Sequence, residues 1–403
     1  MNPEERQQAR MIGWRLQRIR EDRDKSLRVI AGLAGMSTTM LWRIEHGLRG
    51  LDSRAEVAAL ANALGISPSE LTRLPASAPG NGEGAAVTAV RRALIAVTRE
   101  DPAGQVIPVE VLRNRVAALM GTKAEGDYEQ VGSDLPGLIR DLHTSMAAGQ
   151  HVTELLTMVV VLHVQGTQAW LGDMGASMDL GWQAAVLARR AAREHGGSEL
   201  VGLAAFGAAN GLLAAGDFDT AQAELDSVIV PTTTGQAEQL AGMLALSQSL
   251  VAAADKRPED IAAPLDHAAE LAARTGEGNA FGLGFGPTNV GMWRMSAALE
   301  THDHPRAVSV AEGLRPELLP TAERQAAYWT DYGRGLARIR GRQDDAVRAL
   351  HKAELILPAR VHRRPFAREV IGELLTRVRR DSSAGRELAG IASRAGLLEQ
   401  PTG

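Results

Sequence analysis

The sequence predicts an all-α protein built from a small N-terminal helical bundle and a larger body of paired helices. Apolar residues recur at spacings of three and four along the chain, and no stretch shows the two-residue alternation typical of strands. Residues 75–84, PASAPGNGEG, are rich in Pro and Gly and lack periodic apolar residues, which indicates a flexible linker. The predicted domains are therefore 1–74, the linker 75–84, and 85–403.

Residues 26–47, SLRVIAGLAGMSTTMLWRIEHG, predict two short helices joined by a tight turn. Apolar residues at 27, 30, 31 and 34 form one helical face, Gly35 permits the turn, and Ser37 can cap the second helix. Leu41 and Ile44 face inward, so the polar face of the second helix is left for the major groove. The side chains expected to read base edges are Ser37, Thr38, Thr39, Met40, Trp42 and Arg43.

This stretch resembles the lambda-repressor-like, or XRE, helix-turn-helix class, which closes with the pattern Arg-Ile-Glu-x-Gly. Here that pattern is met by residues 43–47, and residues 54–71 resemble the last two helices of the class, so the resemblance covers about residues 10–74 and implies a five-helix domain. It also implies that Arg20 pairs with Glu45 in a structural contact. Leu27 departs from the pattern, because the class carries a glutamine there that contacts the DNA backbone. Arg15, Arg28 and Arg49 are the expected phosphate contacts.

The charge is distributed as a DNA reader requires. Residues 1–74 hold 12 Arg or Lys against 9 Asp or Glu, whereas the other residues hold 32 against 39, a net charge of −7. A basic module on an acidic body concentrates the attraction for phosphate at the reading head. Two alternatives are a small helical bundle of other function and a degenerate copy that no longer binds DNA.

Composition excludes several classes of protein. The chain has 403 residues, 45% hydrophobic residues and a net charge of −4, enough to bury more than one core but too acidic for a protein coated in nucleic acid. With no cysteine, disulfides, thiolate metal sites and cysteine nucleophiles are excluded. The polar N-terminus and the short apolar run near 155–164 predict a cytoplasmic protein with no membrane partner.

The body is expected to consist of successive amphipathic helices. They are predicted near 86–100, 108–120, 127–148, 151–171, 177–195, 199–215, 218–229, 236–254, 259–275, 289–300, 305–314, 322–340, 344–356, 363–380 and 384–394.

A turn signal repeats between some of these helices. Gly216 and Gly341 each precede an alanine by five residues, and a related turn spans 301–307. Taking the alanines at 221, 262, 307 and 346 as equivalent gives spacings of 41, 45 and 39. This resembles the tetratricopeptide repeat (TPR), although the period is longer and the signature incomplete. The resemblance implies a right-handed α-solenoid, and an irregular all-helical domain is the alternative.

The combination of an XRE head and a TPR-like body resembles bacterial regulators whose repeats bind a signalling peptide or another effector. The phase of the repeat predicts a mixed apolar and polar ligand groove. The residues proposed to line it are Phe206, Asn210, Ser247, Asn289, Met292, Trp293, Ser296, Tyr328, Asp331 and Arg338.

Other chemistry is poorly supported by the sequence. The glycines at 282, 284 and 286 lack the dinucleotide-binding spacing and predict a kinked turn that places Phe285 and Trp293 against the groove or the core. His302 and His304 flank Asp303, but three adjacent turn residues rarely converge on one ion, so we predict no metal. No hydrolase, zinc-peptidase or nucleotide-binding motif occurs, so neither catalytic residues nor a cofactor are expected.

These observations predict a cytoplasmic, homodimeric, effector-responsive transcription regulator that binds an inverted-repeat operator in double-stranded DNA. Two alternatives remain open: a DNA-localised scaffold for a protein partner, and a constitutive repressor whose body only dimerises. The operator, the effector and the sign of regulation are not encoded in any motif that we recognise.

Overall fold

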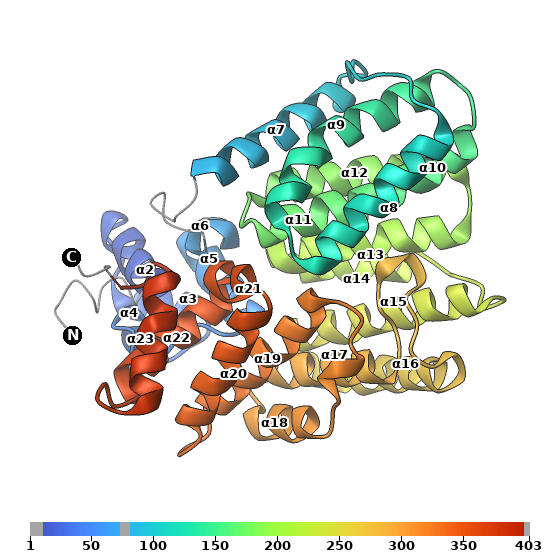
Figure 1. Cartoon of the computed structure of the whole chain (residues 1–403). Coiled ribbons are helices and arrows are strands. Elements are labelled where there is room, and N and C mark those ends of the chain that lie inside the picture. The colour runs from blue at the N-terminus through green and yellow to red at the C-terminus, as the bar shows by residue number, and fades with distance from the viewer. Residues whose placement is uncertain (1–10, 73–80, 399–403) are drawn as a thin grey trace.

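The computed structural model describes residues 11–72 and 81–398, and every regular element in these two ranges is a helix (Figure 1). The all-α prediction is therefore confirmed. Five helices form the N-terminal head: α2 (Met11–Asp22), α3 (Leu27–Leu33), α4 (Thr38–Glu45), α5 (Arg54–Leu64) and α6 (Pro68–Thr72).

The head has its own apolar core. Leu16, Ile30, Leu41 and Leu60 are fully buried and come from four different helices. The predicted cap is confirmed, since Ser37 Oγ accepts a hydrogen bond of 3.1 Å from the Met40 amide. A core drawn from four helices fixes the orientation of α4 relative to the rest of the head.

The body follows from residue 81. Its helices are α7 (Asn81–Thr98), α8 (Val109–Glu125), α9 (Tyr128–Ala147), α10 (Val152–Val161), α11 (Ala169–Asp173), α12 (Met178–His195), α13 (Ser198–Ala215), α14 (Phe218–Asp226), α15 (Gly235–Ala254), α16 (Ala262–Thr275), α17 (Pro287–Glu300), α18 (His304–Glu312), α19 (Ala322–Ala337), α20 (Gln343–Ile356), α21 (Pro358–Arg363), α22 (Pro365–Arg377) and α23 (Ser383–Arg394). A π-helical segment, Leu162–Gln168, joins α10 to α11.

Two differences from the predicted helices affect the linker and the order of the elements. Helix α7 begins at Asn81, inside the segment predicted as linker, and residues 75–80 of that linker lie outside the described residues. Helix α21 was not predicted as a separate element; Pro358 and Pro365 each open a helix here, so the chain breaks between α20 and α22.

The repeated turn is real, but one of its four members was misplaced. Ala221, Ala307 and Ala346 are buried at the fourth position of α14, α18 and α20, where each helix packs on its partner. Ala262 is exposed, because a 3-10 turn at Pro258–Asp260 delays the start of α16, and Leu265 takes the buried position instead. The spacings become 44, 42 and 39, so the hairpins are slightly more regular in length than predicted.

The first and last parts of the body meet. Lys123 in α8 donates a hydrogen bond of 2.9 Å to Glu323 in α19, and Arg364 forms an ion pair with Asp173 at the end of α11. Burial alone would raise the pKa of Glu323, but Lys123 and neighbouring arginines outweigh it and lower that pKa to about 2. These contacts hold α8 and α11 against the C-terminal part of the body.

Two apolar helical stretches lie deep in the body. Residues 152–173 and 198–215 are long and apolar enough to cross a membrane, yet 67% and 61% of their apolar windows are buried within the structure. Phe285 is also fully buried, with its ring against Gly242 in α15, where a larger residue would overlap it. The Gly-rich segment before α17 therefore places Phe285 in the core, which is one of the two positions that the sequence predicted for this side chain.

Candidate nucleic-acid interface and its docking on the body

Helix α4 presents a polar surface that nothing in the described structure covers. Ser37, Thr38, Thr39 and Arg43 are exposed, while Leu41 and Ile44, on the opposite face, are buried in the head core. This is the arrangement by which a recognition helix reaches base edges with hydroxyl and guanidinium groups.

Two of the predicted base-reading residues lie at the margins of this surface. Met40 is half-buried and packs against the head core, so only part of its side chain can face a groove. Trp42 is 42% exposed and its ring stacks on His46 at a centroid distance of 4.3 Å. A stacked, exposed indole next to Arg43 offers an apolar surface for a thymine methyl group.

Two of the three predicted phosphate contacts have partners within the head in this structure. Arg15 donates a hydrogen bond of 2.8 Å to the Leu71 carbonyl and so ties α2 to α6. Arg49 forms a 2.6 Å ion pair with Glu56 of α5. Arg28, by contrast, lies exposed in the first turn of α3 and remains placed for a phosphate.

The predicted pair between Arg20 and Glu45 is confirmed. Arg20 Nε and Nη2 donate hydrogen bonds of 2.6 and 2.9 Å to the two carboxylate oxygens of Glu45. Both residues are buried, and Arg20 Nη1 also donates to the Lys25 carbonyl at 2.9 Å. This bidentate contact joins α2 to the end of α4.

The head is docked on the C-terminal helices of the body, beside which it lies in Figure 1. The buried Glu369 in α22 accepts hydrogen bonds from two backbone amides of the head, Ile12 at 3.2 Å and Leu51 at 3.4 Å. One turn later Glu373 accepts a hydrogen bond of 3.2 Å from the Gly50 amide. Side chains of α22 thus replace water as partners for head amides.

Arginines of α19 complete this docking contact from another side. Arg334 donates a hydrogen bond of 2.6 Å to the Asp52 carbonyl, and Arg338 lies 3.2 Å from the Asp52 carboxylate. Arg54 at the start of α5 forms an ion pair with Glu300 of α17. All these head groups lie in segment 50–54 or near residue 12, so the docking leaves the polar face of α4 exposed.

The docked head shifts the protonation of buried carboxylates. Burial raises the pKa of Glu369 to about 7, although the two backbone amides and Arg338 act in the opposite direction. Burial also opposes ionisation of Asp52, but there Arg338 and Arg334 prevail and the pKa lies below its usual value. The docking contact therefore includes one carboxyl group that titrates near neutral pH.

A cavity of about 530 Å³ lies between the head and the body. Residues of α5 and α6 form one wall, and residues of α12, α13, α17, α19, α21 and α22 form the others. Its lining carries five arginines against three carboxylates, with Phe366, Met178 and Leu213 as apolar surface. The guanidinium group of Arg360 in this lining makes no hydrogen bond or contact ion pair with any residue that the structure describes.

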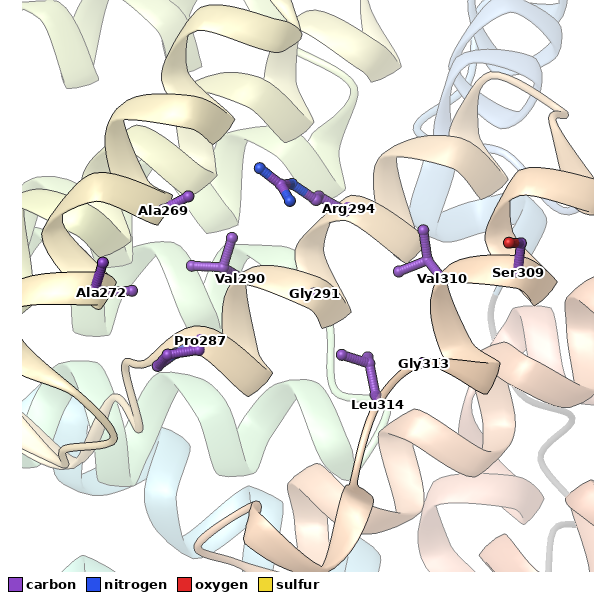
Figure 2. A pocket seen from close by; sticks show the side chains of 11 residues that line it. Ala269, Ala272, Pro287, Val290, Gly291, Arg294, Ser309, Val310, Gly313 and Leu314 are labelled. Atoms are coloured by element: carbon purple, nitrogen blue, oxygen red, sulfur yellow. The ribbon is translucent and has the colours of Figure 1, made fainter.

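A second, shallower pocket of about 470 Å³ lies on the surface between α16, α17 and α18 (Figure 2). Figure 2 shows Val290, Val310 and Leu314 around it, with Arg294 at its edge. It is mostly apolar and includes no residue of the predicted ligand groove.

The predicted ligand groove does not exist as one surface. Phe206, Ser247, Asn289, Met292 and Tyr328 are buried between helices, and Trp293 packs against the main core. Asn210 donates a hydrogen bond to the Phe206 carbonyl, and Arg338 is engaged in the docking contact. Only Ser296 and Asp331 line the cavity beside the head. The phase of the repeat predicted the wrong helix faces, because most of the residues assigned to the groove are buried against neighbouring helices.

Comparison with known proteins agrees with the geometry of the head. The helix-turn-helix domain family matches residues 12–74, which span the five helices of the head from the second residue of α2. This match supports a DNA-binding regulator. No curated protein and no solved structure was found to match the chain.

Proposed function

We propose that this protein is a cytoplasmic, sequence-specific transcription regulator of the XRE type, in which α4 reads the major groove and a TPR-like body controls the head. The observation that supports it is the exposed polar face of α4, which stays uncovered although the head is docked on the body through other residues. The proposed activity is binding and not catalysis, in keeping with the absence of catalytic motifs from the sequence.

The reading role is tested by substitution on the exposed face. Replacing Thr39 or Arg43 by alanine is expected to weaken binding to the cognate operator by roughly 1 to 3 kcal/mol, because each removes a contact to base edges. Neither side chain is in the core, so the fold should persist. The operator is first selected from a random duplex library, and affinities are then measured by fluorescence anisotropy at fixed salt.

Arg18 provides a matched control, since it is an exposed arginine of the head on α2. Arg18→Ala should leave operator affinity nearly unchanged. Equal losses on the operator and on random duplex for Arg43→Ala would show that this residue does not read sequence.

We also propose that the protein acts as a homodimer on an inverted repeat, because one head covers only a half-site and two-fold symmetry doubles the contacts. Sedimentation equilibrium should then show a dimer, and the selected operator should contain two inverted half-sites about one or a few helical turns apart. A monomer that selects a single half-site would contradict this part of the proposal.

The effector, in this proposal, occupies the cavity between head and body. An anionic molecule with an apolar portion fits its excess of arginines, its available Arg360 and its apolar walls. A ligand there touches α5 and α6 of the head as well as the body, so it would favour one docked arrangement over others. The contact of Lys123 with Glu323, which holds α8 against α19, favours this reading over a scaffold, which needs an open groove.

The cavity can be tested with an anionic, apolar probe. Anilinonaphthalene sulfonate should bind the wild-type protein saturably, and Arg360→Ala should weaken that binding roughly tenfold, because a charge-assisted hydrogen bond is lost. Arg340→Ala, at an exposed position outside the cavity, is the control. Equal affinities for the two variants would place the ligand elsewhere. Linkage further requires that a cavity ligand and the operator change each other's affinity by the same factor.

A further inference from the structure

The docking of the head brings together two histidines and a carboxylate that lie far apart in the sequence. His302 lies in the turn between α17 and α18, His304 is the first residue of α18, and Asp52 comes from the segment before α5 in the head. One ligand atom from each of the three lies within 4.8 Å of the others, and His302 Nδ1 lies 3.6 Å from Asp52 Oδ1. Ligand atoms around a tetrahedral zinc ion are about 3.4 Å apart, so modest side-chain rotation would suffice.

We propose that Asp52, His302 and His304 bind a divalent transition-metal ion, Zn²⁺ being the best fit, and that the ion fastens the head to the body. Two imidazoles and one carboxylate are a donor set that zinc accepts, with the fourth position open to water. His302 is 38% exposed on its side chain, which leaves a path for the ion and for that water.

The surroundings of the three residues support the site independently. His302 Nε2 lies 3.4 Å from Glu56 Oε1, so the ring nitrogen opposite the Asp52 side already has a carboxylate acceptor. Histidines that bind metals commonly donate their second ring proton to such a carboxylate, which fixes the ring orientation. In addition, His304 Nδ1 is buried without a hydrogen-bond partner among the described residues. A buried nitrogen of this kind is stabilised by a metal ion.

The nearby arginines do not occupy the proposed ligand atoms. Arg338 lies 3.2 Å from Asp52 Oδ2 and Arg334 binds the Asp52 backbone carbonyl, which leaves Oδ1 facing His302. Residues 302–304 alone do not form such a site, which is why the sequence pattern does not predict a metal here. The third ligand comes from the head, 250 positions earlier in the chain.

The test uses the full-length protein, stripped with a chelator and titrated with Zn²⁺ by isothermal titration calorimetry. Wild type should bind one ion per chain, whereas His302→Ala and His304→Ala should each bind at least tenfold more weakly. His267→Ala removes an exposed histidine of α16 and should bind as wild type does. Glu56→Gln should weaken binding by about 10- to 100-fold, as expected for an outer carboxylate.

A second measurement reports on the link between head and body. Zn²⁺ should slow amide hydrogen exchange in residues 50–57 of wild type and of His267→Ala, and should leave the exchange of His304→Ala unchanged. Circular dichroism establishes that the alanine variants remain folded. Equal zinc affinity across all variants, or no stoichiometric binding by the folded wild type, would overturn the proposal whatever the protein's behaviour toward DNA.

Discussion

Glu45→Ala is expected to destabilise the head by about 3 to 5 kcal/mol, more than any substitution on its exposed surface. Glu45 is 2% exposed and Arg20 is 8% exposed, so removing the carboxylate leaves a desolvated guanidinium whose remaining partners are the exposed Glu21 and the Lys25 carbonyl. The same contact holds the end of α4 on α2. Operator binding should therefore be lost through unfolding of the head and not through loss of a base contact.

The measurement is hydrogen exchange of α2, α3 and α4, combined with urea unfolding. Arg18→Ala breaks an exposed 4.0 Å pair with Asp22 on the same helix and serves as the control, with no measurable change expected. A double variant with Arg20→Met and Glu45→Leu should recover much of the lost stability, because apolar residues of similar size can replace a buried ion pair. A Glu45→Ala head as stable as the Arg18→Ala head would refute the argument.

Local signals in the sequence predicted much of the head correctly. Ser37 precedes a helix whose amide it caps, and Leu41 and Ile44 follow the spacing of a buried face. These features depend on neighbours within one turn of helix, so a periodic pattern suffices to find them. The pair between Arg20 and Glu45 spans 25 residues and was found through the resemblance to a known class, which supplied the missing geometry.

Contacts between distant parts of the chain could not be predicted in this way, because a periodic pattern reports only on neighbours within one helix. Arg15 and Arg49 look like other exposed arginines of the head until their partners, Leu71 and Glu56, are placed beside them. The groove residues were assigned from the positions of the buried alanines, but Phe206, Asn289 and Tyr328 are buried between helices even where the alanine of their hairpin lies as predicted. The docking contact joins residues more than 200 positions apart, and the cavity combines residues of the head with residues of several body helices. A periodic pattern does not indicate which helices of the body contact the head.

The docking contact is expected to weaken as the pH rises through neutrality. Burial raises the pKa of Glu369 to about 7, well above its value in an unfolded chain. Between these two values the folded protein binds more protons than the unfolded chain, so the free energy of unfolding falls as the pH rises from about 4.5 to about 7. For a group that is 7% exposed the full effect is roughly 3 kcal/mol.

The charges around Glu369 make the direction of this dependence testable. Arg338 favours its ionised form, Glu373 disfavours it, and the Ile12 and Leu51 amides donate to its oxygens. Glu369→Gln is neutral at every pH, so the variant should become more stable relative to wild type by up to roughly 3 kcal/mol between pH 5 and pH 8. Comparing the two pH values cancels any constant penalty of the amide group.

Glu259→Gln, at an exposed position of the body, controls for the loss of one negative charge. Urea unfolding at the two pH values should give parallel changes for Glu259→Gln and wild type and a divergent change for Glu369→Gln. Parallel behaviour of all three proteins would mean that Glu369 ionises at its ordinary pKa. The docked head would then be equally stable on either side of neutrality, and pH would not control its release from the body.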